Sequence, residues 1–156
     1  MALKSRMEQH RWDSEHDQQT VPLFLHLQWA QAASLDTMAP TLAKCALSEM
    51  EFDLLATLRN APPPHRMTPS NIQQEMVITS GGLTKVLSQL EARGLISRTQ
   101  QAEDLRVKPA ALTEAGRELI EVAMAAAVRD AAAWFRQRLD GDEMRQLQNL
   151  LEKLSR

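Results

Sequence analysis

Residues 79–94, TSGGLTKVLSQLEARG, decide the fold. Apolar residues recur there at the i, i+3, i+4, i+7 spacing of one helix face: Leu83, Val86, Leu87 and Leu90. This spacing predicts an amphipathic helix, with Thr79 as its N-cap and Gly94 just after its end. Two adjacent glycines, Gly81 and Gly82, fall in the first turn, although glycine costs about 1 kcal/mol relative to alanine inside a helix. Some property of this turn must therefore explain the lost helix propensity.

A second helix is predicted immediately before it, in MTPSNIQQEMVI (residues 67–78). Thr68 suits an N-cap and Pro69 the first helical position, where its missing N–H costs nothing. Ile72 and Met76 supply the apolar i, i+4 pair. The connection to the N-cap at Thr79 is so short that the two helices must cross steeply, as in a helix-turn-helix.

A β-hairpin is predicted directly after these helices. LISRT (95–99) reads as a strand, QQAED (100–104) as a turn and RVKPAAL (106–112) as the return strand. Such a hairpin would form the wing of a winged helix. Pro109 falls inside the predicted return strand, where it removes a hydrogen-bond donor, so we expect that strand to have an open edge there.

The flanking sequence is helical by pattern. One helix is expected from near Thr20 to before Pro40, and the next has Ser48 and Glu51 as a capping box. A helix of about 27 residues is expected from Thr113, followed by a last amphipathic helix. We therefore predict a mainly α fold with a small β wing and a single domain, 1–156. Residues 48–112 form its winged helix-turn-helix lobe, and residues 20–45 and 113–156 form a helical region that the family resemblance described below implies is for dimerisation.

Composition excludes several classes of protein. Hydrophobic residues make up 44% and charged residues 24% of the 156, which is ordinary for a globular domain. No apolar run is long enough for a membrane span, and the charged N-terminal segment does not suit a secretory signal. With a single cysteine, Cys45, no internal disulfide can form, so we expect a cytoplasmic protein without a membrane partner. The net charge of −2 means that any nucleic-acid site must be a local surface.

The outward face of the helix that follows Thr79 favours DNA binding. It carries short polar or small residues and one lysine: Ser80, Gly81, Thr84, Lys85 and Ser88. Short side chains let a helix enter the major groove deeply, and a lysine reaches guanine acceptors or phosphate. The helix start offers free N–H groups to a phosphate, and glycine there allows the backbone to approach closely. The alternative is a plain solvated helix face.

The predicted hairpin adds a second candidate contact. Asp104 and Arg106 lie two residues apart near its tip, so in an extended stretch they share a face. The carboxylate would then hold the guanidinium in a pose suited to a narrow minor groove. The alternative is an ordinary surface ion pair.

Taken together, residues 67–98, then EDLR and then ALTEAGREL resemble the MarR family of winged-helix regulators, most closely the branch of PecS and the urate-responsive regulators. The resemblance implies a homodimer with interlocked terminal helices and two recognition helices in successive major grooves, with half-sites roughly 34–36 Å apart. It also implies a small aromatic or anionic effector that releases DNA. The predicted contacts with double-stranded DNA are Ser70, Asn71, Thr79, Ser80, Gly81, Gly82, Thr84, Lys85, Ser88, Asp104, Arg106 and Lys108.

The resemblance also suggests effector-binding residues. Trp12, Asp53 and Arg98 correspond to ligand residues of the urate-responsive branch. Val86 stands where those relatives carry an arginine, so urate itself is not implied. His26 and Trp29 either line a pocket or pack in the core. Cys45 reads better as a small buried hydrophobe than as a redox sensor.

The leading hypothesis is a ligand-responsive dimeric repressor. Its rival is a protein-interaction module of the same fold that has lost DNA binding, motivated by the acidic net charge and Pro109. We expect no enzyme, because no nucleophile, base and orienting group occur together. We also expect no cofactor or metal, because the four histidines lack ligand spacing.

Overall fold

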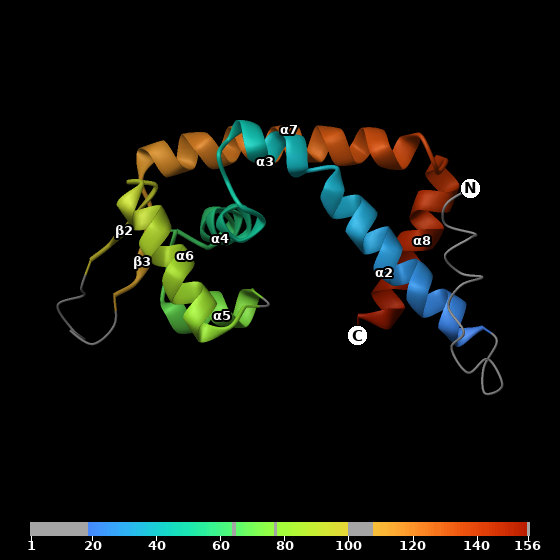
Figure 1. The fold of residues 1–156 in the computed structure, drawn as a ribbon, viewed down its shortest axis with the longest axis horizontal. Coiled ribbons are helices and arrows are strands. Elements are labelled where there is room, and N and C mark those ends of the chain that lie inside the picture. The colour runs from blue at the N-terminus through green and yellow to red at the C-terminus, as the bar shows by residue number, and fades with distance from the viewer. Residues whose placement is uncertain (1–18, 64, 77, 100–107, 156) are drawn as a thin grey trace. The chain divides into compact units, whose positions relative to one another are not determined.

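The computed structural model describes residues 19–63, 65–76, 78–99 and 108–155, and it divides the chain into two compact units, Met1–Thr37 and Met38–Arg156. The first unit contains α2 (Thr20–Asp36). The elements of the second unit are α3 (Ala39–Lys44), α4 (Glu49–Asn60), β1 (Arg66–Met67), α5 (Pro69–Glu75), α6 (Ser80–Ala92), β2 (Ile96–Arg98), β3 (Ala110–Leu112), α7 (Glu114–Arg136) and α8 (Gly141–Leu154). Figure 1 shows these elements along the chain. The mainly α fold with a small β wing is confirmed.

The helices begin at the capping residues that the sequence indicates. The Thr68 and Thr79 hydroxyls accept hydrogen bonds from the Asn71 and Gly82 N–H groups, both at 3.2 Å. Ser48 and Glu51 form the expected capping box at the start of α4. Gly94 follows α6 with a φ of 68°, a left-handed conformation that glycine adopts without strain. The helix-turn-helix, α5 and α6, is thereby confirmed.

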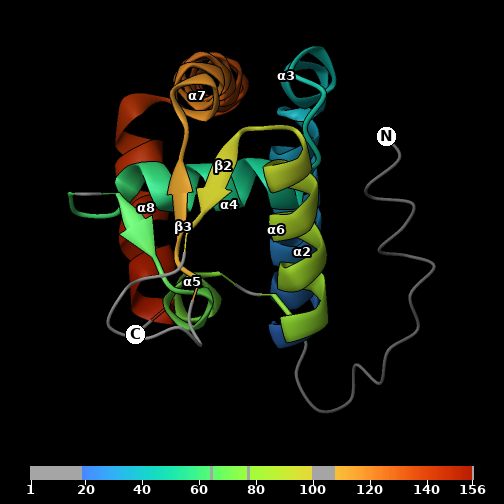
Figure 2. The same cartoon turned by 90° about the vertical axis from the view of Figure 1, so that its left-hand side faces the viewer.

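The core of the second unit forms around α4, which packs against α5, α6, α7 and β3. The largest fully buried side chains come from several elements: Leu54, Leu55, Leu58, Ile72, Leu87, Leu90 and Ile120. Gly116, at the start of α7, lies so close to the Leu95 carbonyl that a Cβ would approach its oxygen to 1.9 Å. This packing holds α6 and the sheet on one common core (Figure 2).

The wing differs from the predicted two-stranded hairpin. The sheet has three antiparallel strands in the order β1-β3-β2, with Arg66 opposite Ala111 and Ser97 opposite the same residue from the other side. The prediction that Pro109 lies inside an edge strand is wrong. Pro109 is buried and precedes β3, which is the central strand. A proline has no N–H for a ladder, so regular pairing begins one residue later.

A short helix was missed near Pro40. The first helix ends at Asp36, and Pro40 lies in the opening turn of α3. Proline is well tolerated in that turn because the first N–H groups of a helix lack intrahelical partners. The helix after Thr113 is confirmed, although it spans 23 residues and ends at Arg136.

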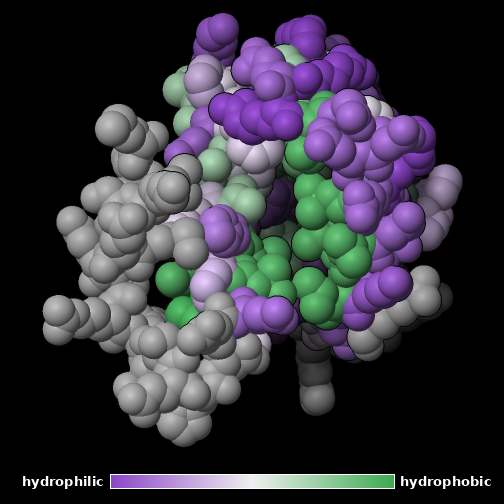
Figure 3. Space-filling view, turned by 90° about the vertical axis from the view of Figure 1, so that its right-hand side faces the viewer, coloured by the Kyte–Doolittle hydropathy of each residue, from purple (hydrophilic) through white to green (hydrophobic). Residues whose placement is uncertain are grey.

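Two helices expose apolar side chains. No residue of α8 is buried, and its exposed hydrophobic residues are Leu147, Leu150, Leu151 and Leu154. α2 likewise has no buried residue and exposes Leu23, Phe24, Leu27 and Leu35. Figure 3 shows apolar side chains in the open on the face that carries α8.

Candidate nucleic-acid interface

α6 has the two faces that the sequence predicts. Leu83, Val86, Leu87 and Leu90 are buried against the core. The opposite face is exposed and carries Ser80, Gly81, Thr84, Lys85 and Ser88. In Figure 2 the helix stands beside the sheet, so that one side of it remains uncovered by the described elements of the second unit. The helix thus presents a row of short polar side chains and one cation.

The paired glycines of α6 differ in their surroundings. A Cβ on Gly82 would lie 3.1 Å from Thr79 Oγ1 and 3.2 Å from Ile78 Cγ1, closer than ordinary van der Waals contact. The N-cap and the preceding loop therefore explain Gly82. A Cβ on Gly81 would meet nothing within 4 Å. The described part of the fold does not require glycine at position 81.

The first turn of α6 also offers hydrogen-bond donors. The Thr79 hydroxyl accepts a hydrogen bond from the Gly82 N–H, and the Thr84 hydroxyl donates one to the Ser80 carbonyl at 3.0 Å. The first N–H groups of a helix have no intrahelical acceptor, so those of Ser80 and Gly81 can bind an anion. The first turn of α6 therefore resembles a phosphate-binding helix start that lacks bulky side chains.

The other predicted DNA contacts are only partly described. Ser70 and Asn71, in the first turn of α5, are exposed, as is Lys108. Asp104 and Arg106 lie outside the described residues. Neither Lys85 nor Lys108 forms an ion pair with another described residue, so both charges are available to a phosphate.

Arg98 lies at the end of β2 and is partly buried. Its guanidinium approaches Glu91 of α6 at 3.8 Å, and its Nε has no hydrogen-bond partner among the described residues. Of the other predicted effector residues, Trp12 lies outside the described residues. His26 and Trp29 are neighbours on α2, with ring centroids 6.0 Å apart in an edge-to-face arrangement.

Asp53 lines a hollow of about 360 Å³ between α4 and α5. Its other lining residues are Met50, Ala56, Thr57, Asn60, Glu75 and Met76. Partial burial of the carboxyl, together with the nearby charge of Glu49, raises the pKa of Asp53. Arg98 is not among the lining residues, so the structure does not bring these two predicted ligands into one hollow.

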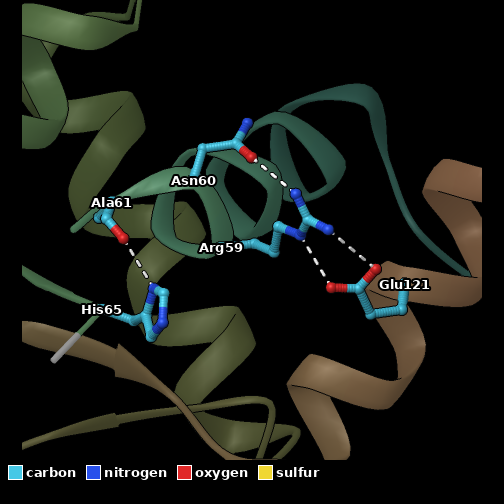
Figure 4. Close-up of polar contacts among 5 residues, drawn as sticks. All are labelled: Arg59, Asn60, Ala61, His65 and Glu121. Carbon is cyan, nitrogen blue, oxygen red and sulfur yellow. Dashed lines mark hydrogen bonds and ion pairs between the residues drawn. The ribbon is translucent and has the colours of Figure 1, made fainter. Parts of the chain in front are cut away.

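A second hollow of about 380 Å³ shares Thr57, Asn60 and Glu75 with the first and is also lined by Arg66, Met67 and Asn71. Sequence reasoning missed Arg66, because the short strand that places it is too short for a periodic signal. Asn60, in the wall, accepts a hydrogen bond from Arg59, which also pairs with Glu121 of α7 at 2.8 Å (Figure 4). Figure 4 also shows the bond from His65 Nδ1 to the Ala61 carbonyl that holds the loop after α4.

Other kinds of site find no support in the described part of the chain. No group of three His, Cys, Asp or Glu side chains is placed to hold a metal there. No helix in the same residues is long and apolar enough to cross a membrane. Cys45 is half-buried and packs against the core cluster.

The sequence profile of the MarR family matches residues 47–108, which contain α4, β1, the helix-turn-helix and β2. Over these residues the chain is similar to the MarR family. It is 28% identical over 113 residues to an HTH-type transcriptional regulator of Bacillus cereus, covering 72% of this chain and 73% of that one. It is 38% identical over 78 residues to the regulator PecS of Dickeya dadantii, covering 50% of this chain and 47% of PecS.

Among solved structures, the chain resembles a cysteine-to-serine variant of MarR from Escherichia coli in complex with operator DNA. The TM-score is 0.77 and the identity 22%, covering 86% of this chain and 94% of that one. This likeness shows that the winged-helix fold is shared. With this family match and relatives of this kind, the protein is an HTH-type transcriptional regulator.

Proposed function

We propose that this regulator is a homodimeric repressor that reads a pseudo-palindromic operator with α6. Each α6 would enter one of two successive major grooves, with half-sites roughly 34–36 Å apart. The MarR structure with operator DNA supports this proposal, because its fold is the same. The proposed contacts are those predicted from the sequence on α5, α6 and the wing, Asp104 and Arg106 included.

Gly81 is the observation that carries the proposal. It is exposed, and a side chain there would touch no described part of the protein, yet the position keeps the residue with the lowest helix propensity apart from proline. Glycine at position 81 is explained if the start of α6 lies directly against the DNA, because only glycine allows the protein backbone to approach so closely. Lys85, one turn later on the same face, would supply the charge that a phosphate or guanine requires.

The proposed dimer would use residues 20–45 and 113–156. The leucines of α8 support it: Leu150 is 51% and Leu154 66% exposed in the single chain. Contiguous apolar patches on monomers rarely exceed a few hundred Å², and larger ones usually mark interfaces. A second copy of this chain would cover the α8 surface and set the distance between the two α6 helices.

The proposed effector is a small aromatic or anionic molecule that releases the operator. Hollows of about 360 and 380 Å³ beside α4 are large enough for a compact ligand. Asp53, Arg98, His26, Trp29 and Trp12 remain the proposed ligands. An effector that weakens DNA binding must itself be bound more weakly by the DNA-bound protein, because the coupling is reciprocal. The proposed compartment is the cytoplasm.

The test is a fluorescence anisotropy titration at low salt. One duplex is taken from the region upstream of the chain's own gene, and the other is a mixed-sequence duplex of equal length. We expect tighter binding of the first, with affinity falling steeply as salt rises. If neither duplex binds, the protein is not a DNA-reading repressor, and the interaction module of the same fold replaces this proposal.

A further inference from the structure

We infer that an ion pair between Glu51 and Arg93 positions the recognition helix for reading DNA. This inference rests on the proposed function of α6. It concerns the end of α6 opposite the DNA-reading turn, where no DNA contact is predicted. Both residues act through α6 and neither is proposed to touch DNA, so they are positioning residues.

The geometry gives each oxygen of the Glu51 carboxylate its own partner. Oε2 accepts the Ser48 N–H at 2.8 Å and the Ser48 hydroxyl at 3.0 Å, which closes the capping box of α4. Oε1 accepts the Arg93 Nη1–H at 2.9 Å. Arg93 is the C-cap residue of α6. One side chain therefore ties the first turn of α4 to the last turn of the recognition helix, and we call this arrangement the α4–α6 clamp.

Burial separates Glu51 from the acidic partners of the other described ion pairs, while the Arg93 side chain is 34% exposed. Glu51 is the buried acidic residue among the described residues, and its side chain is 10% exposed. By comparison, the side chains of the Arg59–Glu121 pair are 40% and 49% exposed. A buried carboxylate is costly unless it is paired, so removing Arg93 from Glu51 costs more than breaking a pair of exposed side chains. An exposed pair can exchange its partner for water at little cost.

The clamp fixes the position and direction of α6, which the apolar core alone does not. Leu83, Val86, Leu87 and Leu90 hold α6 through contacts that are not directional, so the helix can slide or tilt at small cost in buried area. Charge-assisted hydrogen bonds fix both distance and direction. In some proteins buried ionic groups specify one arrangement even where they add little stability.

The length of α6 amplifies small changes at the clamp. Its 13 residues span roughly 20 Å at about 1.5 Å per residue. A tilt of about 5° around the C-terminal end then moves the first turn by roughly 1.7 Å. A bidentate contact with a base does not tolerate such a displacement, whereas a phosphate contact through a flexible lysine does. Loosening the clamp should therefore reduce discrimination between sequences more than binding itself.

The experiment compares variants of the full chain. Glu51→Gln keeps an oxygen for the Ser48 N–H but sets an amide donor against the Arg93 donors. Arg93→Met removes the partner and leaves the Glu51 charge buried. The double variant, Glu51→Gln with Arg93→Met, has no buried charge and should recover most of the melting temperature. Arg59→Met removes the exposed pair from the same helix and is the matched control.

Each protein is titrated with two duplexes: one enriched by the wild-type protein from a random-sequence pool, and one of mixed sequence. The readout is the ratio of their dissociation constants, measured well below every melting temperature. We expect this ratio to fall about tenfold in both single variants and in the double variant, with mixed-sequence binding within about twofold of wild type. The Arg59→Met ratio should match wild type.

Two results would overturn the inference. If the double variant recovers both stability and the wild-type ratio, the clamp contributes only to folding and the inference is wrong while the proposed function stands. If the wild-type protein enriches no sequence and binds both duplexes equally, the proposed function fails and the inference fails with it.

Discussion

Substituting Gly81 with alanine separates the needs of the fold from the needs of DNA binding. The added methyl group meets nothing within 4 Å, so it introduces no strain. Alanine is favoured over glycine in a helix by up to about 1 kcal/mol. For a chain of this size that gain raises the melting temperature by about 2–4 °C. We therefore expect Gly81→Ala to be more stable than the wild-type protein.

DNA binding should change in the opposite direction. If the backbone at position 81 lies against the groove, a methyl group forces the helix start outward by about the radius of the group. Losing one well-fitted contact costs about 1–3 kcal/mol, which is a weakening of roughly 5- to 150-fold. The assays are thermal unfolding of the free protein and anisotropy titration with an enriched duplex, both on the same preparation.

Gly82→Ala serves as the matched control. It makes the same chemical change one residue later, but its methyl group approaches Thr79 Oγ1 and Ile78 Cγ1 at 3.1 and 3.2 Å. Its stability gain should be smaller than that of Gly81→Ala, or absent. A Gly81→Ala protein that is more stable and binds DNA as tightly as wild type would refute the reasoning, because the glycine would then serve neither the fold nor the interface.

The other predictions test separate parts of the proposal. Arg106→Ala should weaken DNA binding and leave the melting temperature nearly unchanged; a large melting shift would make the arginine structural. Lys85→Ala should lower the slope of log affinity against log salt by about one, measured between 50 and 200 mM salt, and an unchanged slope and sequence preference would remove Lys85 from the interface. Leu150→Lys should convert the dimer to monomer in light scattering, since it places a charge on the exposed apolar surface of α8, whereas an unchanged mass would exclude that surface. Folding raises the pKa of Asp53, so the folded state binds more protons than the unfolded state, and the stability that Asp53 contributes at low pH is lost as pH rises through its folded pKa. Asp53→Asn should therefore be more stable than wild type at pH 7. Denaturant titrations at several pH values should show a flatter dependence of its stability on pH.

The sequence sufficed for local structure near capping residues. Thr68, Thr79 and Ser48 each precede a helix that starts where they predict, because capping depends on residues three positions apart. The buried face of α6 could be predicted for the same reason, since its period lies within one element. Pro40 was misread because a proline marks both the residue after a helix and the opening turn of the next, and only the fold distinguishes the two.

The sequence alone could not predict which strands pair when they lie far apart in the chain. β1 has two residues, Arg66 and Met67, and it exists because β3 offers them an edge. No periodicity exists in two residues, so neither the strand nor the placement of Arg66 beside a hollow could be predicted. Pro109 was wrongly placed for the same reason: whether β3 is an edge or a central strand depends on β1, which pairs with it from more than 40 residues away in the sequence.

Glu51 combines both situations in one side chain. Its capping role depends on Ser48, three residues away, and the sequence predicts it. Its second role depends on Arg93, 42 residues away, and only the packing of α4 against α6 reveals it. A carboxylate that served the cap alone would face water with its free oxygen at no cost. Here the side chain is only 10% exposed and its second oxygen is bound by Arg93, the C-cap residue of α6, so an error in the position of α6 leaves a buried charge without that partner. Glu51, a capping residue of α4, therefore also affects the position of α6. Comparing Glu51→Gln with the Glu51→Gln, Arg93→Met double variant separates these two roles.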